Sequence, residues 1–216
     1  ATYSVATVLV DSSATDSDTF NLTFTADDDI DGTVAGIETI NVTASYYADA
    51  DLDMSLSGVA AGTTVNVITV AGSIMDQADI TNAKTSTLNF NASFDDVDVT
   101  GTNNSDLTID LARASEAAAT SLVIQGATVD EVTVTSAGDL TITGSTNDGA
   151  LNVTTQGDAD ITAAAATSAT VTTEDEAAIT SMAAVTSLTL SSTGTAAAPS
   201  TIVAAGALTT VDLSGN

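Results

Sequence analysis

The sequence predicts an all-β protein, and more specifically a parallel β-solenoid of short strands, on three observations. Apolar and polar residues alternate with a period of two along most of the chain, whereas helical periodicity is nearly absent. From residue 122 onward, the alternating runs recur every 8 to 11 residues or so, roughly the spacing of stacked or sandwiched strands. The apolar set consists mainly of Ala, Val, Leu and Ile with only 3% aromatic residues, which suits a thin core.

Each expected strand is a short run with β-branched residues on at least one face and Gly or Asp near its ends. In chain order, the runs are residues 20–24, 40–43, 52–56, 65–67, 88–91, 97–99, 107–111, 132–135, 140–143, 151–154, 171–172, 188–190 and 211–213. Ile124 and Ile161 continue the same regular series in the second half of the chain.

The alternative fold is a set of β-sandwich domains, whose hairpins favour two-residue Asn-Gly or Asp-Gly turns. Only Asp31-Gly32 and Asp148-Gly149 match that pattern. Similar segments recur instead at 106–110 and 139–143, and a shorter one begins at Asp160. We interpret each as a corner aspartate followed by a strand whose apolar residues enter the core. The recurrence favours the solenoid over the sandwich.

The chain divides into an irregular N-terminal solenoid half, residues 1–111, and a more regular half, residues 121–216. Residues 112–120 form a boundary or a corner loop between them. Two segments rich in Ala and Glu, 112–119 and 173–178, have the composition of one or two helical turns. Within an all-β chain, corner loops are the better interpretation of both. The chain begins with Ala1 and not Met, which suggests a processed protein or a piece of a longer one.

The composition argues against an enzyme. The chain has no His, Cys or Trp, and its basic residues are Lys84 and Arg113 alone, against 29 acidic residues. General acid–base catalysis near neutral pH, activated nucleophiles and cationic clamps all depend on residues that are scarce or missing here. Paired carboxylates can hydrolyse sugars, but such sites usually also hold aromatic platforms, and Tyr is rare in this chain.

The formal charge of −27 restricts partners and environment. Nucleic acid is excluded as a partner because phosphate binding needs a basic face. No apolar run approaches the ~18 residues of a membrane span, so no membrane insertion is expected. The mean hydropathy of +0.28 argues against a disordered chain. Crowded carboxylates repel one another, and salt or bound Ca²⁺ relieves this repulsion, which points to an extracellular location.

Clusters of aspartates at short spacing are the candidate Ca²⁺ ligands, because Ca²⁺ takes six to eight oxygen ligands and prefers carboxylates. Asp49, Asp51 and Asp53 have the spacing that opens an EF-hand loop, but Met54 replaces its glycine and Ala60 its closing glutamate, so an EF-hand is rejected. The alternative interpretation is an acidic surface that merely hydrates the protein in salt. The candidate metal ligands are Asp27, Asp29, Asp31, Asp49, Asp51, Asp53, Asp96, Asp98, Asp106, Asp158 and Asp160.

One stretch resembles a known family. Residues 18–25 read Asp-Thr-Phe-Asn-Leu-Thr-Phe-Thr, and residues 36–43 read Gly-Ile-Glu-Thr-Ile-Asn-Val-Thr. This stretch resembles bacterial surface-layer (S-layer) proteins of the calcium-dependent, type-I-secreted, RTX-related kind. The resemblance implies a parallel β-solenoid, a two-dimensional lattice on the cell surface, and Ca²⁺ at coil corners and between subunits. The chain departs from that family in lacking clear glycine-paired nonapeptides.

We therefore expect a structural, self-assembling protein at the extracellular cell surface, a homo-oligomer that forms a lattice or a filament. Ca²⁺ is expected to bridge its acidic corners and subunits, and a cell-surface polysaccharide is a further partner reached through bridging cations. The alternative is a segment of a large secreted adhesin or an ice-binding module. The pairs Thr133/Thr135 and Thr141/Thr143 suggest an ice-binding face. However, such rows of threonine are short and interrupted in the sequence, which favours an ordinary solvated face.

Overall fold

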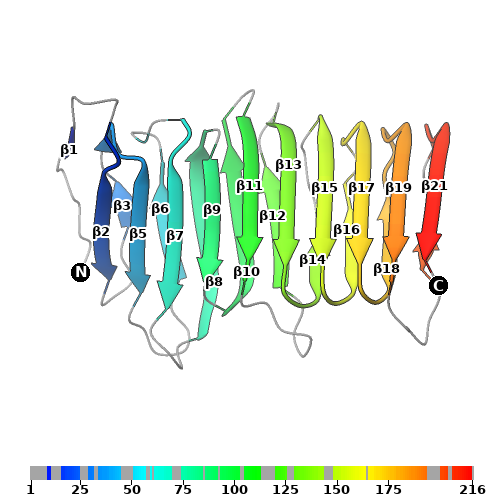
Figure 1. Ribbon diagram of the computed structural model, residues 1–216, viewed down its shortest axis with the longest axis horizontal. Coiled ribbons are helices and arrows are strands. Elements are labelled where there is room, and N and C mark those ends of the chain that lie inside the picture. Colours follow the sequence, from blue (N-terminus) through cyan, green and yellow to red (C-terminus); the bar gives the residue numbers. More distant parts are fainter. Residues whose placement is uncertain are drawn as a thin grey trace.

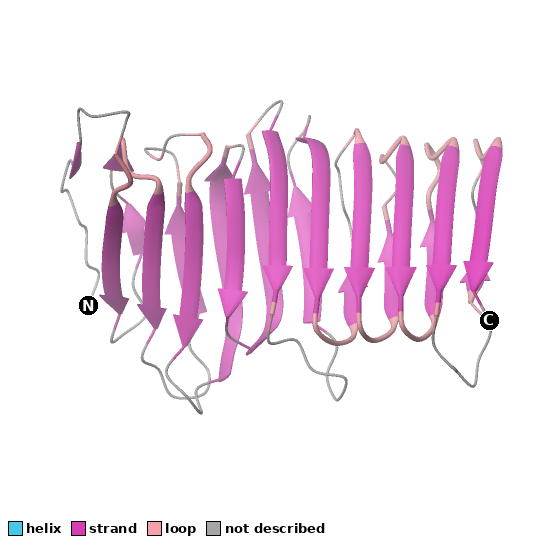
Figure 2. Cartoon of the chain, viewed as in Figure 1, coloured by secondary structure: helices cyan, strands magenta, loops and turns pink. Residues whose placement is uncertain are grey.

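The computed structural model is all-β, and it confirms the parallel β-solenoid and excludes the sandwich alternative (Figure 1). Every strand pairing is parallel, and no helix occurs in the parts of the chain that the structure describes (Figure 2). Those parts are residues 9–10, 16–24, 29–31, 34–44, 51–56, 59, 61–69, 74–84, 86–91, 93–102, 105–112, 120–125, 129–143, 148–163, 165–193, 200–203 and 206–215.

The strands form two long sheets that lie along the axis of the rod (Figure 1). The chain alternates between the sheets, so neighbours within one sheet come from successive coils. The ten-stranded sheet contains, in order, β2 (Thr19–Phe24), β5 (Thr39–Ala44), β7 (Thr64–Thr69), β9 (Ser86–Asn91), β11 (Ser105–Leu111), β13 (Val129–Ser136), β15 (Ala150–Thr155), β17 (Ser168–Thr173), β19 (Ser187–Ser192) and β21 (Thr210–Gly215).

The nine-stranded sheet lies opposite and runs in the same chain order. It contains β3 (Asp29–Asp31), β6 (Asp51–Ser55), β8 (Ile74–Ala83), β10 (Ser93–Gly101), β12 (Thr120–Gln125), β14 (Leu140–Ile142), β16 (Ala159–Thr162), β18 (Ala177–Ser181) and β20 (Thr201–Ile202). The short strands β1 (Leu9–Val10) and β4 (Val34–Ala35) pair separately at the N-terminal end.

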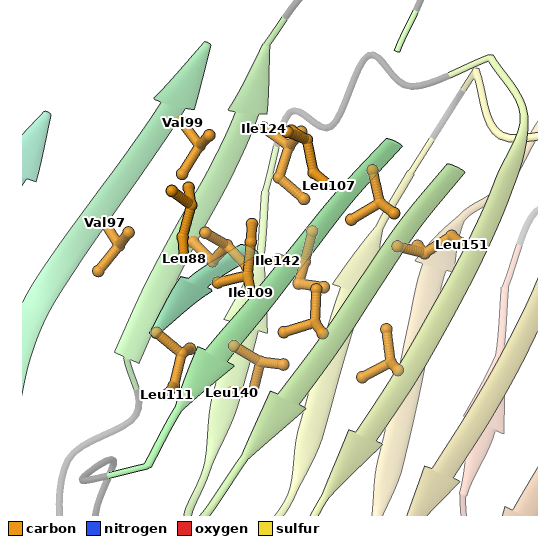
Figure 3. Close-up of a cluster of buried hydrophobic side chains, with 14 of the residues drawn as sticks. Leu88, Val97, Val99, Leu107, Ile109, Leu111, Ile124, Leu140, Ile142 and Leu151 are labelled. Atoms are coloured by element: carbon orange, nitrogen blue, oxygen red, sulfur yellow. The ribbon is translucent and has the colours of Figure 1, made fainter. Parts of the chain in front are cut away.

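The core fills the space between the two sheets. Alternate residues of each strand point inward and are buried, as the period-two pattern predicts. Figure 3 shows these side chains meeting from both sheets, among them Leu88 and Ile109 from one sheet and Val97 and Ile142 from the other. Most core residues are aliphatic, and the one aromatic pair among the described residues is Phe90 and Phe94, whose ring centroids lie 5.5 Å apart. A thin aliphatic core matches the composition.

Both sheets continue across the expected boundary at 112–120. β11 pairs with β9 on one side and with β13 on the other, and β10 pairs with both β8 and β12. Residues 113–119 themselves lie outside the described part of the chain. The second predicted corner, 173–178, joins β17 to β18 through a bend at 174–175, so a corner and not a helix occurs there.

Buried hydroxyl groups hold the C-terminal corners together. Ser136 and Thr155 both donate to the carbonyl of Gly138, at 2.9 and 2.5 Å, and Thr173 donates to that of Gly157 at 2.5 Å. Thr155 is 2% exposed, and its hydroxyl also accepts the backbone N–H of Gly157 at 3.2 Å. These hydroxyls satisfy corner backbone groups that would otherwise be buried without partners.

Candidate functional site

Aspartates from separate coils align on the outer face of the nine-stranded sheet. Asp53, Asp79 and Asp98 are in register on β6, β8 and β10, and the backbone position of Asp29 on β3 continues the series. Neighbouring strands in a sheet are about 4.8 Å apart, so these positions repeat at about that interval along the rod. We call these four positions the aspartate column.

A second polar series runs beside the aspartate column. Asp51, Gln77 and Asp96 are in register on the same three strands, two residues before the corresponding column positions. The positions 51/53 and 96/98, which lie far apart in the sequence, thus occupy the same stretch of this sheet. Gln77 connects the two series because its Nε2 donates to Oδ1 of Asp79 at 2.9 Å.

Negative charges on this surface repel one another at Asp98. Partial burial, and after it the nearby carboxylates of Asp79 and Asp96, raise the pKa of Asp98 above its ordinary value. A cation at this position would relieve the repulsion. However, the described residues contain no group of three or more acidic, His or Cys side chains placed to hold a metal ion. In its described part, the aspartate column is therefore an anionic surface and not a preformed ion cage.

The other predicted ligands lie apart from the aspartate column. Asp106 and Asp160 lie within strands β11 and β16 and not at corners, which corrects the interpretation of both as corner residues. Asp158 does lie at a corner, where its Oδ1 accepts the backbone N–H of Glu176 at 2.8 Å. Asp139 accepts the N–H of Asp158 in the same way at 3.0 Å. These corner carboxylates connect one coil to the next.

Some predicted ligands have no described side chain. Asp27 and Asp49 lie outside the described residues, and for Asp29, Asp31 and Asp51 the structure describes the strand position alone. Asp79 was missed by the sequence analysis. Its nearest acidic neighbour in the sequence is Asp76, three residues earlier, and only the register of β8 against β6 and β10 brings Asp79 between Asp53 and Asp98.

The outer face of the ten-stranded sheet carries a long rank of threonines. One register position is Thr on every strand except β15 and β21, where Asn152 and Asp212 occupy it. The rank is far longer than the sequence pairs suggested, because its members are separated by whole coils in the chain. Its residues, which we call the threonine rank, are Thr19, Thr39, Thr64, Thr87, Thr108, Thr133, Thr170 and Thr189.

A ladder of asparagines runs beside the threonine rank. Asn41 donates to Asn21, Asn66 to Asn41 and Asn89 to Asn66, with side-chain N···O distances of 2.8, 2.7 and 2.8 Å. The next position in register is Asp110 on β11, which accepts a hydrogen bond from the Thr135 hydroxyl at 2.9 Å. An open depression of about 310 Å³ lies where the asparagine ladder meets Asp110.

The last coil exposes apolar residues whose counterparts in the preceding coil are buried. Val211 and Leu213 on β21 are 47% and 63% exposed, whereas Leu188 and Leu190, their partners in register on β19, are almost fully buried. Ile202 on β20 is likewise exposed above the buried Ile179. We call this the apolar end.

The described residues offer little catalytic machinery. The Nζ of Lys84 donates a hydrogen bond to the carbonyl of Val59 at 2.7 Å. Arg113 lies outside the described part of the chain. The expectation that the chain is not an enzyme stays a prediction. A search of the described residues for a helix long and apolar enough to cross a membrane found none.

Comparisons with known proteins add no relative. No protein-family model, no curated protein and no solved structure matches the chain at a significant level.

Proposed function

We propose that the protein is a structural, self-assembling component of an extracellular surface layer or filament, in which solenoids stack end to end and Ca²⁺ bridges their acidic faces. The observation that carries this proposal is the aspartate column, which aligns Asp53, Asp79 and Asp98 on one face of the rod. At the apolar end, Val211, Leu213 and Ile202 lie exposed above buried core residues of the preceding coil. A further coil is the surface that fits there, and either following residues of the same chain or a second molecule supplies one.

The energetics favour a coil as the covering group. Burying a Val, Leu or Ile side chain contributes about 1.5–3 kcal/mol each, and the unpaired edge of β21 offers backbone donors and acceptors to a parallel strand. Association costs on the order of 4–15 kcal/mol in lost freedom of motion, so the apolar end supplies a useful but limited part of the affinity. Assembly therefore also requires that the acidic faces of two molecules do not repel each other strongly.

Charge is the main obstacle to assembly, since each molecule carries a formal charge of −27. The aspartate column gives a divalent cation a place to bind between two molecules, because each face supplies some of the six to eight oxygens that Ca²⁺ requires. The raised pKa of Asp98 is in accord with a face that gains from a bound cation. The resemblance of residues 18–44 to calcium-dependent S-layer proteins supports the same proposal.

Light scattering and negative-stain electron microscopy test it with the protein in CaCl₂, in NaCl of equal ionic strength, and in chelator. We expect ordered assemblies in CaCl₂ that dissolve in chelator. Replacing both Val211 and Leu213 by Asp is expected to prevent end-to-end growth. The matched control, Thr210→Asp with Ser214→Asp, adds the same charge to polar positions of the same strand and should still assemble.

Three outcomes would contradict the proposal. A protein that stays monomeric in CaCl₂ at high concentration does not self-assemble. Assembly that is equal in CaCl₂ and NaCl removes the role of Ca²⁺. Equal loss of assembly in the two double variants shows that added charge, and not the apolar end, is responsible.

A second candidate function, an ice-binding module of a secreted adhesin, is favoured by the threonine rank. Its members repeat at the strand spacing of about 4.8 Å, and on β2, β5, β7 and β9 the asparagine ladder lies about 6.7 Å away along the strand, so this part of the face is a regular two-dimensional array of polar groups. Ice shaping and thermal hysteresis test this function. Thr87→Tyr with Thr133→Tyr should abolish ice shaping, whereas Thr141→Tyr, on the other sheet, should leave it intact. Absence of ice shaping by the unmodified protein would reject it.

A further inference from the structure

The asparagine ladder has a direction, and that direction creates a mismatch where it ends. Each amide donates through Nδ2 to Oδ1 of the asparagine on the preceding coil, from Asn89 back to Asn21. The Oδ1 of Asn89 is therefore left to accept a hydrogen bond from the next coil. The residue in register there is Asp110, and an ionised carboxylate has no hydrogen to donate.

Asp110 does not resolve the mismatch through its other contact. The Thr135 hydroxyl donates to Oδ1 of Asp110, so the carboxylate is again the acceptor. Two acceptors, the Asn89 amide oxygen and the Asp110 carboxylate, thus occupy adjacent ladder positions, and neither can donate a hydrogen bond to the other. Water can supply the missing donors in this open depression, and a ligand that brings hydrogen-bond donors of its own can replace that water.

The surroundings indicate the size and chemistry of that ligand. The depression at this point has a volume of about 310 Å³ and is lined by Asn66, Ile68, Asn89, Asn91, Asp110 and Ala112. This volume is at the lower end of the roughly 300–1,000 Å³ typical of small-molecule sites. Ile68 is 37% exposed, and every other exposed large apolar side chain among the described residues lies in the last coil, at 202, 203, 211 and 213.

We propose that this depression binds a saccharide unit. Two of its hydroxyl groups donate, one to Oδ1 of Asn89 and one to the Asp110 carboxylate, while the C–H face of the sugar ring lies against Ile68 and Ala112. A bare divalent cation fits less well, because only one carboxylate lines the depression and the cation would gain nothing from the apolar side. The site would let the protein contact a glycan directly, without a bridging ion.

The expected affinity of one site is weak. No aromatic residue lines the depression, so the stacking that strengthens many sugar sites is missing. A dissociation constant in the millimolar range, about −4 kcal/mol of binding free energy, is the reasonable expectation. Many copies on one surface would convert weak single sites into firm attachment to a polysaccharide.

Side-chain amide NMR of the whole ¹⁵N-labelled chain tests the proposal, with chelator present so that the protein stays dispersed. The probes are glucose, galactose and N-acetylglucosamine, with glycerol as a small polyol. We expect at least one sugar to shift the amide signals of Asn66, Asn89 and Asn91 in a saturable way. Because the measurement uses dispersed protein, its failure would not reject self-assembly, nor would failed assembly reject the sugar site.

Asp110→Asn is the decisive variant. Its new amide is expected to donate to Oδ1 of Asn89, which extends the asparagine ladder, raises thermal stability and weakens sugar binding at least about tenfold, or 1.4 kcal/mol. The matched control is Asp212→Asn, an exposed aspartate on the same face of the same sheet, which should bind sugar as the unmodified protein does.

Three results would overturn the proposal. The first is the absence of shifts with every sugar. The second is a saturable response of the same amides to CaCl₂, in the absence of chelator, with none to sugars, which would make the site a cation site. The third is a loss of stability in Asp110→Asn, because it would mean that all four amides run the other way and that Asn89 already donates to Asp110.

Discussion

The N-terminal coils from β2 to β9 and the C-terminal coils from β13 to β19 are held together in different ways. In the N-terminal coils, the ladder partners Asn21 to Asn89 are 20, 25 and 23 residues apart along the chain, so coil length varies. From β13 to β19, register partners are 18 or 19 residues apart, and the corner bonds of Asp139 and Asp158 join residues 19 and 18 apart. Uniform coils let corner groups meet from coil to coil, whereas variable coils can align only within their strands, where the asparagine ladder lies.

The cores of the two regions also differ in the size of their buried side chains. The N-terminal coils contain the large residues Phe90 and Phe94, packed edge to face at 84°. The C-terminal coils bury no aromatic residue among those described and bury more Ala, among them Ala159, Ala169 and Ala177, beside Leu and Ile. A coil with longer, more variable corners encloses more space and needs larger side chains to fill it. The comparison teaches that one solenoid architecture tolerates both solutions because each coil contacts only its neighbours.

The largest expected effect is that of Phe90→Ala. Phe90 is fully buried, and removal of its ring is expected to cost about 3–5 kcal/mol in free energy of unfolding. Hydrogen exchange should show lost protection in β7, β9 and β11 while β15, β17 and β19 remain protected, since coupling is between neighbouring coils. Equal loss along the whole rod would show that the two regions form one cooperative unit. Thr87→Ala, an outward position of the same strand, is the control.

Gly149→Ala tests how closely the uniform coils approach one another. A Cβ at Gly149 would lie 1.7 Å from the backbone oxygen of Asp130 on the preceding coil, so the backbone itself must move. We expect a loss of about 1–3 kcal/mol in free energy of unfolding, measured by chemical denaturation. Gly206→Ala is the matched control, because a Cβ there meets nothing within 4 Å. Equal stability of the two variants would mean that the coils can separate at little cost.

Thr155→Val tests the corner hydroxyls with almost no change in shape. The variant removes the donor to Gly138 and the acceptor for the N–H of Gly157, both in buried surroundings. The expected loss is about 1–3 kcal/mol, measured as the shift of the denaturation midpoint. Thr154→Val, at the exposed neighbouring position, should change stability little. Similar effects at both positions would show that the corner bonds contribute nothing particular.

The smallest expected effect is that of pH on Asp98. Because its pKa is raised in the folded protein, the folded state binds more protons than the unfolded chain between the ordinary and the raised pKa. Stability should therefore fall as the pH rises through that window when divalent cations are absent. Asp98→Asn should flatten this dependence and raise the Tm near neutral pH by about 2 °C or less, since partly exposed carboxylates interact weakly. A slope that persists in Asp98→Asn would assign the pH dependence to other groups.

The sequence was sufficient for the fold class, because period-two alternation is a local property that records which side chains face the core. The sequence predicted strands less well where apolar and polar residues do not alternate clearly. The residues of β8 do not alternate clearly between apolar and polar. In β18, Ala177 is buried and Ala178 occupies an outward position, so an apolar residue stands where the pattern expects a polar one. The sequence pattern therefore gave no sign of either strand.

By itself, then, the sequence determined an acidic, aliphatic all-β chain of stacked short strands, since composition and alternation depend on near neighbours. Only the tertiary structure decided which residues share a surface. Asp79 joins Asp53 and Asp98, the threonines form one rank, and Asp110 follows the asparagine ladder because register aligns residues that whole coils separate in the chain. Coil lengths vary with corner geometry, so no fixed spacing in the sequence marks these alignments.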